Sequence, residues 1–164
     1  MNQSELKELA FRINGLLGFK VETPEVRDLL QTCGFSTEHE LDPEESTKYL
    51  EDKSNGFCLL VEDNSIIPRT EVRELPAGTL VLIGSYLYAQ DTEGYAAFVG
   101  ELPLGIHWSD GLESLSARLG EPQSEIRSKK TGRITAQRWN NPPHLVTASY
   151  KVTGELESLY LGFY

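Results

Sequence analysis

Thr79-Leu-Val-Leu-Ile-Gly-Ser-Tyr-Leu-Tyr-Ala89 is the most strand-like stretch of this 164-residue sequence. Valine, isoleucine, leucine and tyrosine fill it, and residues 91–94, Asp-Thr-Glu-Gly, follow as a turn signal. We predict a central β-strand over residues 79–89. The same composition predicts strands at residues 48–50 and 56–62 before it, and a strand that pairs back at residues 95–99.

Further strands are predicted on both sides of this centre. Residues 66–67 and 70–73 are predicted to form an edge strand, because Pro68 between them cannot donate a hydrogen bond within a sheet. The Thr153-Gly154 dipeptide is typical of a tight hairpin turn. In the second half of the chain we predict strands at residues 135–139, 145–152 and 156–163.

Three amphipathic helices are predicted beside these strands. Residues 6–17 carry apolar side chains at helical spacing, with Asn2 as the cap and Glu5 completing a capping box. Residues 23–34 and 109–120 each open with a hydroxyl side chain and close on a glycine. Together the patterns predict an α+β fold, an antiparallel sheet with helices packed on one face.

The last two predicted helices indicate a faint internal repeat. Residues 23–34 and 109–120 share their cap, their apolar face and their final glycine, about half the chain apart. Similarity between any two capped amphipathic helices is the alternative explanation. A duplication would give two tandem helix–sheet units, an N-terminal half at residues 1–100 and a C-terminal half at 101–164, which we expect to form one compact unit.

The charge balance favours a basic partner. The chain has 25 acidic and 15 basic residues and a net charge of −10, which disfavours nucleic acid and anionic membranes, although solubility alone also accounts for it. The basic residues 127–133 are expected to form a solvated hairpin. The longest apolar runs are strand-sized, and residues 1–5 lack the features of a secretory signal, so we expect a cytoplasmic protein.

Catalytic and metal-binding patterns are missing from the sequence. His39, His107 and His144 lie far apart and form no ligand-spaced pair. Cys33 and Cys58 fall within apolar patterns without Cys-x-x-Cys spacing, so we expect reduced core thiols. Nucleophile-elbow and phosphate-loop motifs are absent. We therefore predict a protein that is not an enzyme and that holds no cofactor or metal.

Acidic side chains gather in one part of the chain. Residues 1–63 contain fourteen acids and six bases, while the remainder is almost balanced. Such a patch can steer a basic protein partner or occupy its positively charged active site. A solvated loop without a partner is the alternative. The predicted partner-binding residues are Glu38, Glu40, Asp42, Glu44, Glu45, Glu51 and Asp52.

The C-terminal part of the chain resembles a known class of proteins. Gly94-Tyr-Ala-Ala-Phe-Val-Gly-Glu-Leu-Pro-Leu-Gly-Ile-His-Trp-Ser109 leads into a helix that ends Arg118-Leu-Gly-Glu-Pro122. Arg138-Trp139 and two strands, at residues 146–150 and 156–161, follow. This order resembles immunity proteins encoded beside polymorphic or contact-dependent bacterial toxins. Similar helix-plus-sheet repeats occur in β-lactamase inhibitory proteins and, as single units, in outer-membrane assembly lipoproteins, but this chain lacks their lipobox cysteine and disulfide pairs.

The resemblance implies an inhibitor of a toxin. We expect an immunity protein that binds a cognate toxin domain and blocks its active site or the approach of its substrate. A nuclease is one candidate toxin, because nuclease sites are often basic. Two alternatives stay open: a non-catalytic assembly or regulatory adaptor, and an enzyme whose site lies near His107, Trp108 or His144.

Overall fold

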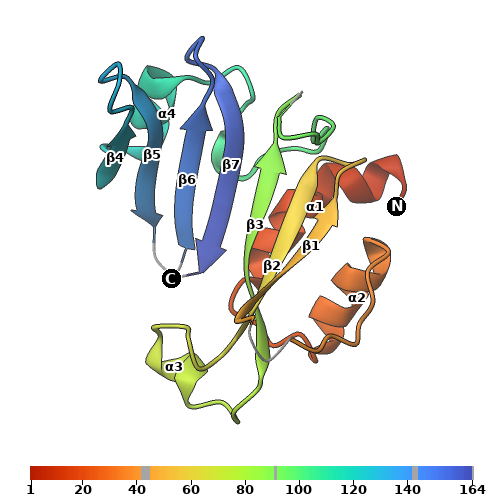
Figure 1. Ribbon diagram of the computed structural model, residues 1–164. Helices are drawn as coiled ribbons and strands as arrows, with labels where there is room; N and C mark the ends of the chain where they lie inside the picture. Colours follow the sequence, from red (N-terminus) through yellow and green to blue (C-terminus); the bar gives the residue numbers. More distant parts are fainter. Residues whose placement is uncertain (42–44, 91, 142–143, 164) are drawn as a thin grey trace.

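The computed structural model describes residues 1–41, 45–90, 92–141 and 144–163 (Figure 1). In chain order its elements are α1 (Gln3–Leu16), α2 (Pro24–Thr32), β1 (Thr47–Asp52), β2 (Phe57–Asp63), α3 (Thr70–Arg73), β3 (Leu80–Tyr88), the 3₁₀ turn η1 (Pro103–Gly105), α4 (Leu112–Leu119), β4 (Ser124–Arg127), β5 (Ile134–Asn141), β6 (His144–Tyr150) and β7 (Leu156–Phe163). None of the helices in these ranges has the length and apolar composition that crossing a membrane requires.

The described strands form one antiparallel sheet in the order β1-β2-β3-β7-β6-β5-β4. Strands β3 and β7 pair from Gly84 opposite Gly162 to Tyr88 opposite Ser158. This pairing makes the sheet continuous between the parts of the chain before and after residue 100. The predicted α+β class with an antiparallel sheet is confirmed.

Helix α1 begins with the predicted capping box. The Asn2 side-chain oxygen accepts a hydrogen bond from the Glu5 backbone N–H at 2.9 Å, and the Glu5 carboxylate accepts one from the Asn2 N–H at 2.6 Å. At the start of α2, by contrast, the Thr23 hydroxyl donates to the Lys20 carbonyl at 2.9 Å and makes no cap. Pro24 occupies the first position of α2, where its missing N–H costs no hydrogen bond.

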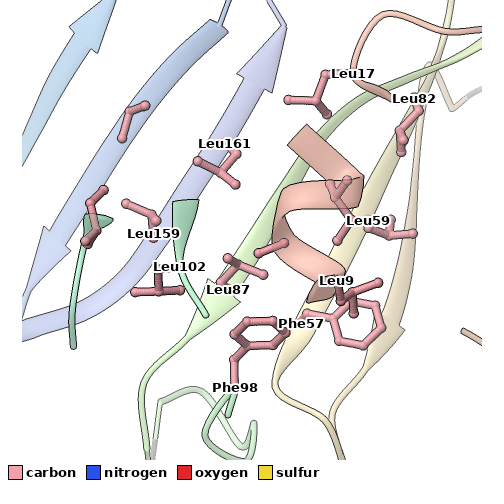
Figure 2. Packing of buried hydrophobic residues seen from close by; sticks show 14 of the residues in the cluster. Leu9, Leu17, Phe57, Leu59, Leu82, Leu87, Phe98, Leu102, Leu159 and Leu161 are labelled. Atoms are coloured by element: carbon pink, nitrogen blue, oxygen red, sulfur yellow. The ribbon is translucent and has the colours of Figure 1, made fainter. Parts of the chain in front are cut away.

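The main core lies between the sheet and helices α1, α2 and α4 (Figures 1 and 2). Leu9 of α1 packs with Phe57 and Leu59 of β2, and Phe57 meets Phe98 edge to face at 6.4 Å between ring centroids. Each fully buried side chain of this size contributes about 1.5–3 kcal/mol by leaving water. These helices therefore cover one face of the sheet.

A second, smaller cluster lies on the opposite face. Alternate residues of β2, Cys58 and Leu60, pack there with Ile67 and Val72. The prediction of an edge strand at residues 66–67 and 70–73 is wrong, because the first two lie in no described strand and the others form α3. The side chain of the buried Asn64 holds this turn in place by donating to the carbonyls of Val72, at 3.3 Å, and Leu75, at 3.0 Å.

The strand predicted at residues 95–99 is also wrong. The edge of β3 that it would need is paired with β7, so this segment crosses the end of the β2–β3 pair instead. Its backbone is held by single hydrogen bonds, from Ala96 to the Lys53 carbonyl and from Phe98 to the Tyr88 carbonyl. A Cβ at Gly56 would lie 2.2 Å from the carbonyl oxygen of Ala96, which shows how closely the two segments cross.

The second half differs from prediction at two further points. Helix α4 begins after Gly111, and the Ser114 hydroxyl accepts a hydrogen bond from the Gly111 N–H at 2.9 Å, so Ser109 is not its cap. Strand β4 was not predicted, since all four of its residues are exposed and show no apolar alternation. The basic residues 127–133 lie at the hairpin between β4 and β5, as expected.

Candidate functional site

The face of the sheet opposite α1, α2 and α4, here called the open face, carries a group of tyrosines. Strand alternation places Tyr86 and Tyr88 on this face, because Leu87 between them points into the main core. Tyr160 of the neighbouring strand β7 packs on Tyr86, with 4.8 Å between ring centroids. The rings of Tyr86 and Tyr88 stack at 6.1 Å.

The loop after β3 adds a fourth ring, that of Tyr95. It stacks on Tyr88 with 3.9 Å between centroids and 18° between ring planes. We call these four residues, Tyr86, Tyr88, Tyr95 and Tyr160, the tyrosine cluster. Aromatic pairs in such geometry contribute about 0.5–1.5 kcal/mol beyond the burial of their surface. The four rings therefore form one packed aromatic group on the sheet.

A hollow of about 450 Å³ lies beside the tyrosine cluster on the open face. Its floor comes from the middle of the sheet and its wall from edge strand β1 and the loop after β3. The lining residues are Tyr49, Glu51, Lys53, Cys58, Tyr86, Tyr88, Glu93, Tyr95, Ser149 and Ser158. Strands β1, β2, β3, β6 and β7, the β1–β2 turn and the loop after β3 all contribute to the lining, which makes this hollow the candidate functional site.

Glu51 is the polar centre of the hollow. The Tyr95 hydroxyl donates a hydrogen bond to one oxygen of its carboxylate. The Lys53 ammonium lies 3.7 Å from the other oxygen and 5.6 Å from the centroid of the Tyr95 ring. Side chains from β1, the β1–β2 turn and the loop after β3 therefore meet at the Glu51 carboxylate.

Glu93 reaches the hollow from a tight turn. Glu93 and Gly94 both have positive φ, of 51° and 80°, and the Tyr95 N–H donates to the Thr92 carbonyl at 2.8 Å. Two successive residues of this kind form the turn type that suits hairpins. A non-glycine residue with positive φ carries strain of order 1 kcal/mol. The turn is anchored to β7 by the Thr92 hydroxyl, which donates to the Glu157 carbonyl at 3.3 Å.

Burial shapes the ionisation of the groups around the hollow. It raises the pKa of the Cys58 thiol to about 12, and the negative charge of Glu51 acts in the same direction. Burial also raises the pKa of Tyr88 and of Tyr95, and for Tyr95 the hydrogen bond to Glu51 adds to the increase. At neutral pH Cys58, Tyr88 and Tyr95 are therefore protonated, and the thiol is unreactive.

The predicted acidic patch is divided by the fold. Glu51 lines the hollow, whereas Asp52 points to the other side of β1 by strand alternation. Asp52 closes the β1–β2 turn, where its carboxylate accepts hydrogen bonds from the Ser54 hydroxyl at 2.7 Å and the Asn55 side chain at 2.7 Å. Burial of Asp52 opposes ionisation, but these bonds outweigh it and hold its pKa below the usual value.

Glu38, Glu40 and Glu45 lie before β1, at the opposite end of that strand from Glu51. Glu38 and Glu40 line a second hollow of about 300 Å³ together with His39 and Arg27. Glu45 is exposed just before β1. Asp42 and Glu44 lie outside the described residues. The structure thus brings Glu38 and Glu40 together, but it brings neither of them to Glu51.

Histidines and tryptophans do not converge on a common site. The Nε2 atom of His39 and the Nδ1 atom of His144 are buried without a hydrogen-bond partner among the described residues. The indole N–H of Trp108 donates to the Phe98 carbonyl at 2.9 Å, and that of Trp139 to the Gly120 carbonyl at 2.8 Å. In the described part of the chain no three His, Cys, Asp or Glu side chains are grouped closely enough to hold a metal ion.

Sequence reasoning missed most of the hollow. Tyr49, Glu93 and Tyr95 were not singled out as site residues, because Tyr49 lies in β1 and the other two in the loop after β3, and the sequence does not show that these two segments meet. One signal was present: Tyr86-Leu-Tyr88 alternates within the most strand-like stretch, and alternation places both tyrosines on one face.

Comparison with known proteins adds one structure. No protein-family model matches the chain, and no curated protein sequence matches it. The crystal structure of a DUF4309 family protein (YjgB) from Bacillus subtilis aligns with 98% of this chain and 97% of its own, at 10% sequence identity and a TM-score of 0.44. At this identity and score the likeness supports no inference about function.

Proposed function

We propose that this chain is an immunity protein that binds a cognate toxin domain through the open face of its sheet. Binding there would block the active site of the toxin or the approach of its substrate. The observation that carries the proposal is the hollow of about 450 Å³ on the face opposite α1, α2 and α4, in which Glu51 accepts a hydrogen bond from Tyr95, one of the stacked tyrosines of the lining. The resemblance of residues 94–164 to immunity proteins supplies the biological setting, in which the two proteins meet in the cytoplasm.

The side chains of this face suit protein recognition. Tyrosine is enriched at protein–protein interfaces, since a rigid ring buries a large area and its hydroxyl can bond to the partner. Tyr49 leaves 59% of its surface exposed at the rim of the hollow, while Tyr88 and Tyr95 are almost fully buried. Because Tyr88 and Tyr95 are already held by their packing, they lose little side-chain entropy on binding, and the exposed ring of Tyr49 is free to contact the partner.

Charge complements this surface. The chain carries a net charge of −10, and Glu51 and Glu93 bring two carboxylates to the hollow. Such a field accelerates encounter with a basic protein and repels acidic ones. In this proposal Glu38, Glu40 and Glu45, at the far end of β1, contribute to steering at long range rather than to the contact itself.

The proposed inhibition needs no chemistry from this chain. Burial raises the pKa of both thiols, Cys33 and Cys58, to about 12, so neither is available as a nucleophile at neutral pH. His107 contributes its backbone N–H to the Asp110 carboxylate at 2.8 Å, a contact that shapes the start of α4. The protein would act by occupying a surface.

Coexpression tests this function. The chain is produced together with the product of the adjacent gene in a host that this product kills when it is made alone. Survival of the host, together with a stable complex in size-exclusion chromatography, is the expected result. Killing that is unaffected by the chain, with no complex, contradicts the proposal. A complex without survival contradicts it as well and favours the adaptor.

A further inference from the structure

The hollow on the open face has the chemistry of a site for an organic cation. Aromatic ring faces carry negative electrostatic potential, and cations bind them within about 6 Å of the ring centroid. Tyr95 presents such a ring to the Lys53 ammonium, 5.6 Å from the ring centroid, and Glu51 and Glu93 add two formal negative charges to the lining. Neutral side chains of the sheet, such as Ser149 and Ser158, complete the floor.

One cation of the chain already lies at this place. The Lys53 ammonium is 3.7 Å from the Glu51 carboxylate and 5.6 Å from the centroid of the Tyr95 ring. The side chains of Lys53 and Glu51 remain 57% and 46% exposed, and an ion pair with this exposure contributes little to stability. Lys53 can therefore move away at small cost when another cation arrives.

Glu51 and the ring of Tyr95 place the cation at the β1 side of the hollow, where the Lys53 ammonium already lies. Charges of both signs act on Tyr86 in the middle of the sheet, where burial and Glu93 raise its pKa and Arg138 of β5 lowers it. A second cation near Arg138 would be repelled, whereas one between the two glutamates would be attracted.

We infer that this hollow binds the guanidinium or ammonium group of a basic side chain of the partner protein, between Glu51, Glu93 and the ring of Tyr95. Lys53 occupies the place of that group in the free protein. The inference rests on the proposed function, since it specifies the residue type through which the toxin would enter the open face.

Titration of the full-length chain with small probes tests the site without the partner. The probe is N-acetyl-arginine-N-methylamide, and its uncharged counterpart of nearly equal shape, N-acetyl-citrulline-N-methylamide, is the control. Amide NMR spectra are expected to show saturable shifts at millimolar arginine probe, confined to the residues around Glu51, Lys53 and Tyr95. Citrulline is expected to leave these amides unchanged.

Three variants make the test specific. Lys53→Ala is expected to tighten binding of the arginine probe about threefold, because it removes the competing cation. Glu51→Gln is expected to weaken binding about three- to fivefold. Glu113→Gln, at an exposed position of α4, is expected to leave binding unchanged. Equal response to both probes, shifts spread over the surface, or indifference to the Lys53 and Glu51 substitutions would overturn the inference.

The two proposals fail separately. Survival in the coexpression experiment with no arginine site removes the inference and leaves the immunity function. A specific arginine site with no survival removes the function and leaves the cation site.

Discussion

The hydroxyl of Tyr95 donates a hydrogen bond to the carboxylate of Glu51, which joins the loop after β3 to edge strand β1. The two residues are 44 positions apart in the sequence. The same tyrosine ring stacks on Tyr88 of β3, so one side chain connects the edge of the sheet to its middle. This contact forms one wall of the hollow on the open face.

Removing that hydroxyl tests the contact. Tyr95→Phe keeps the stacked ring and loses the hydrogen bond, so we expect the free energy of unfolding to fall by about 1 kcal/mol. Urea denaturation at pH 7 measures it. Tyr49→Phe is the matched control, because Tyr49 is 59% exposed, and it is expected to change stability by less than about 0.5 kcal/mol. Equal effects of the two substitutions would mean that the Tyr95 hydroxyl contributes nothing.

Two glycines are expected to respond in opposite directions to alanine. A Cβ at Gly84 would lie 2.6 Å from the Tyr160 hydroxyl oxygen and 2.7 Å from a ring carbon, so Gly84→Ala displaces the tyrosine. The expected loss of stability is about 1–3 kcal/mol. Gly15 in α1 has open space around its Cβ position, and Gly15→Ala is expected to add about 0.5–1 kcal/mol. Urea midpoints that move in the same direction for both variants would contradict this packing.

The thiols are expected to be inert in the folded protein. With a pKa raised to about 12 by burial, Cys33 and Cys58 carry on the order of a thousandfold less thiolate at pH 8 than free cysteine. Ellman's reagent should therefore modify the native protein far more slowly than free cysteine. In 8 M urea, chosen to unfold the chain, two thiols should react promptly. Rapid modification of Cys58 in the native protein would show that it is not buried in the second cluster.

Stability is expected to decline at alkaline pH. The two thiols and Tyr86, Tyr88 and Tyr95 have pKa values raised by burial in the folded state. The unfolded chain therefore loses these protons at a lower pH than the folded protein. Their contribution is complete below pH 9, where the unfolded thiols are still protonated, and is lost as pH rises through the folded pKa values.

Urea midpoints at pH 7, 8 and 10.5 measure this decline. We expect similar midpoints at pH 7 and pH 8, and a clearly lower one at pH 10.5. Cys58→Ala removes one of the groups and should reduce the slope above pH 9. A midpoint that stays constant or rises at pH 10.5 would contradict the burial of these groups.

Local signals in the sequence predicted the elements that depend on neighbouring residues. The capping box of Asn2 and Glu5 and the strand at residues 79–89 are of this kind, because the residues that determine them lie within a few positions of one another. The wrong predictions concern segments whose structure depends on contacts with distant parts of the chain. Residues 95–99 could form a strand only if an edge of β3 were free, and β7 occupies that edge.

The candidate site also depends on contacts between segments that are distant in the sequence. Glu51 and Asp52 are adjacent in the sequence, yet the alternation of β1 separates them onto opposite faces. Tyr95 meets Glu51, and Glu93 lines the same hollow, after a tight turn with positive φ at Glu93 and Gly94. Counting charges in the sequence identified Glu51 but not Tyr95, its hydrogen-bond partner 44 positions away.

The most direct test of the central claim compares two substitutions of exposed aromatic residues. Tyr49→Lys places a positive charge on the rim of the open face, and Phe11→Lys places the same charge on α1, on the far side of the sheet, where Phe11 is 47% exposed. Both variants are coexpressed with the toxin and checked for unchanged urea midpoints. We predict that Tyr49→Lys loses protection of the host while Phe11→Lys retains it; full protection by Tyr49→Lys, or its loss with Phe11→Lys alone, would contradict binding through the open face.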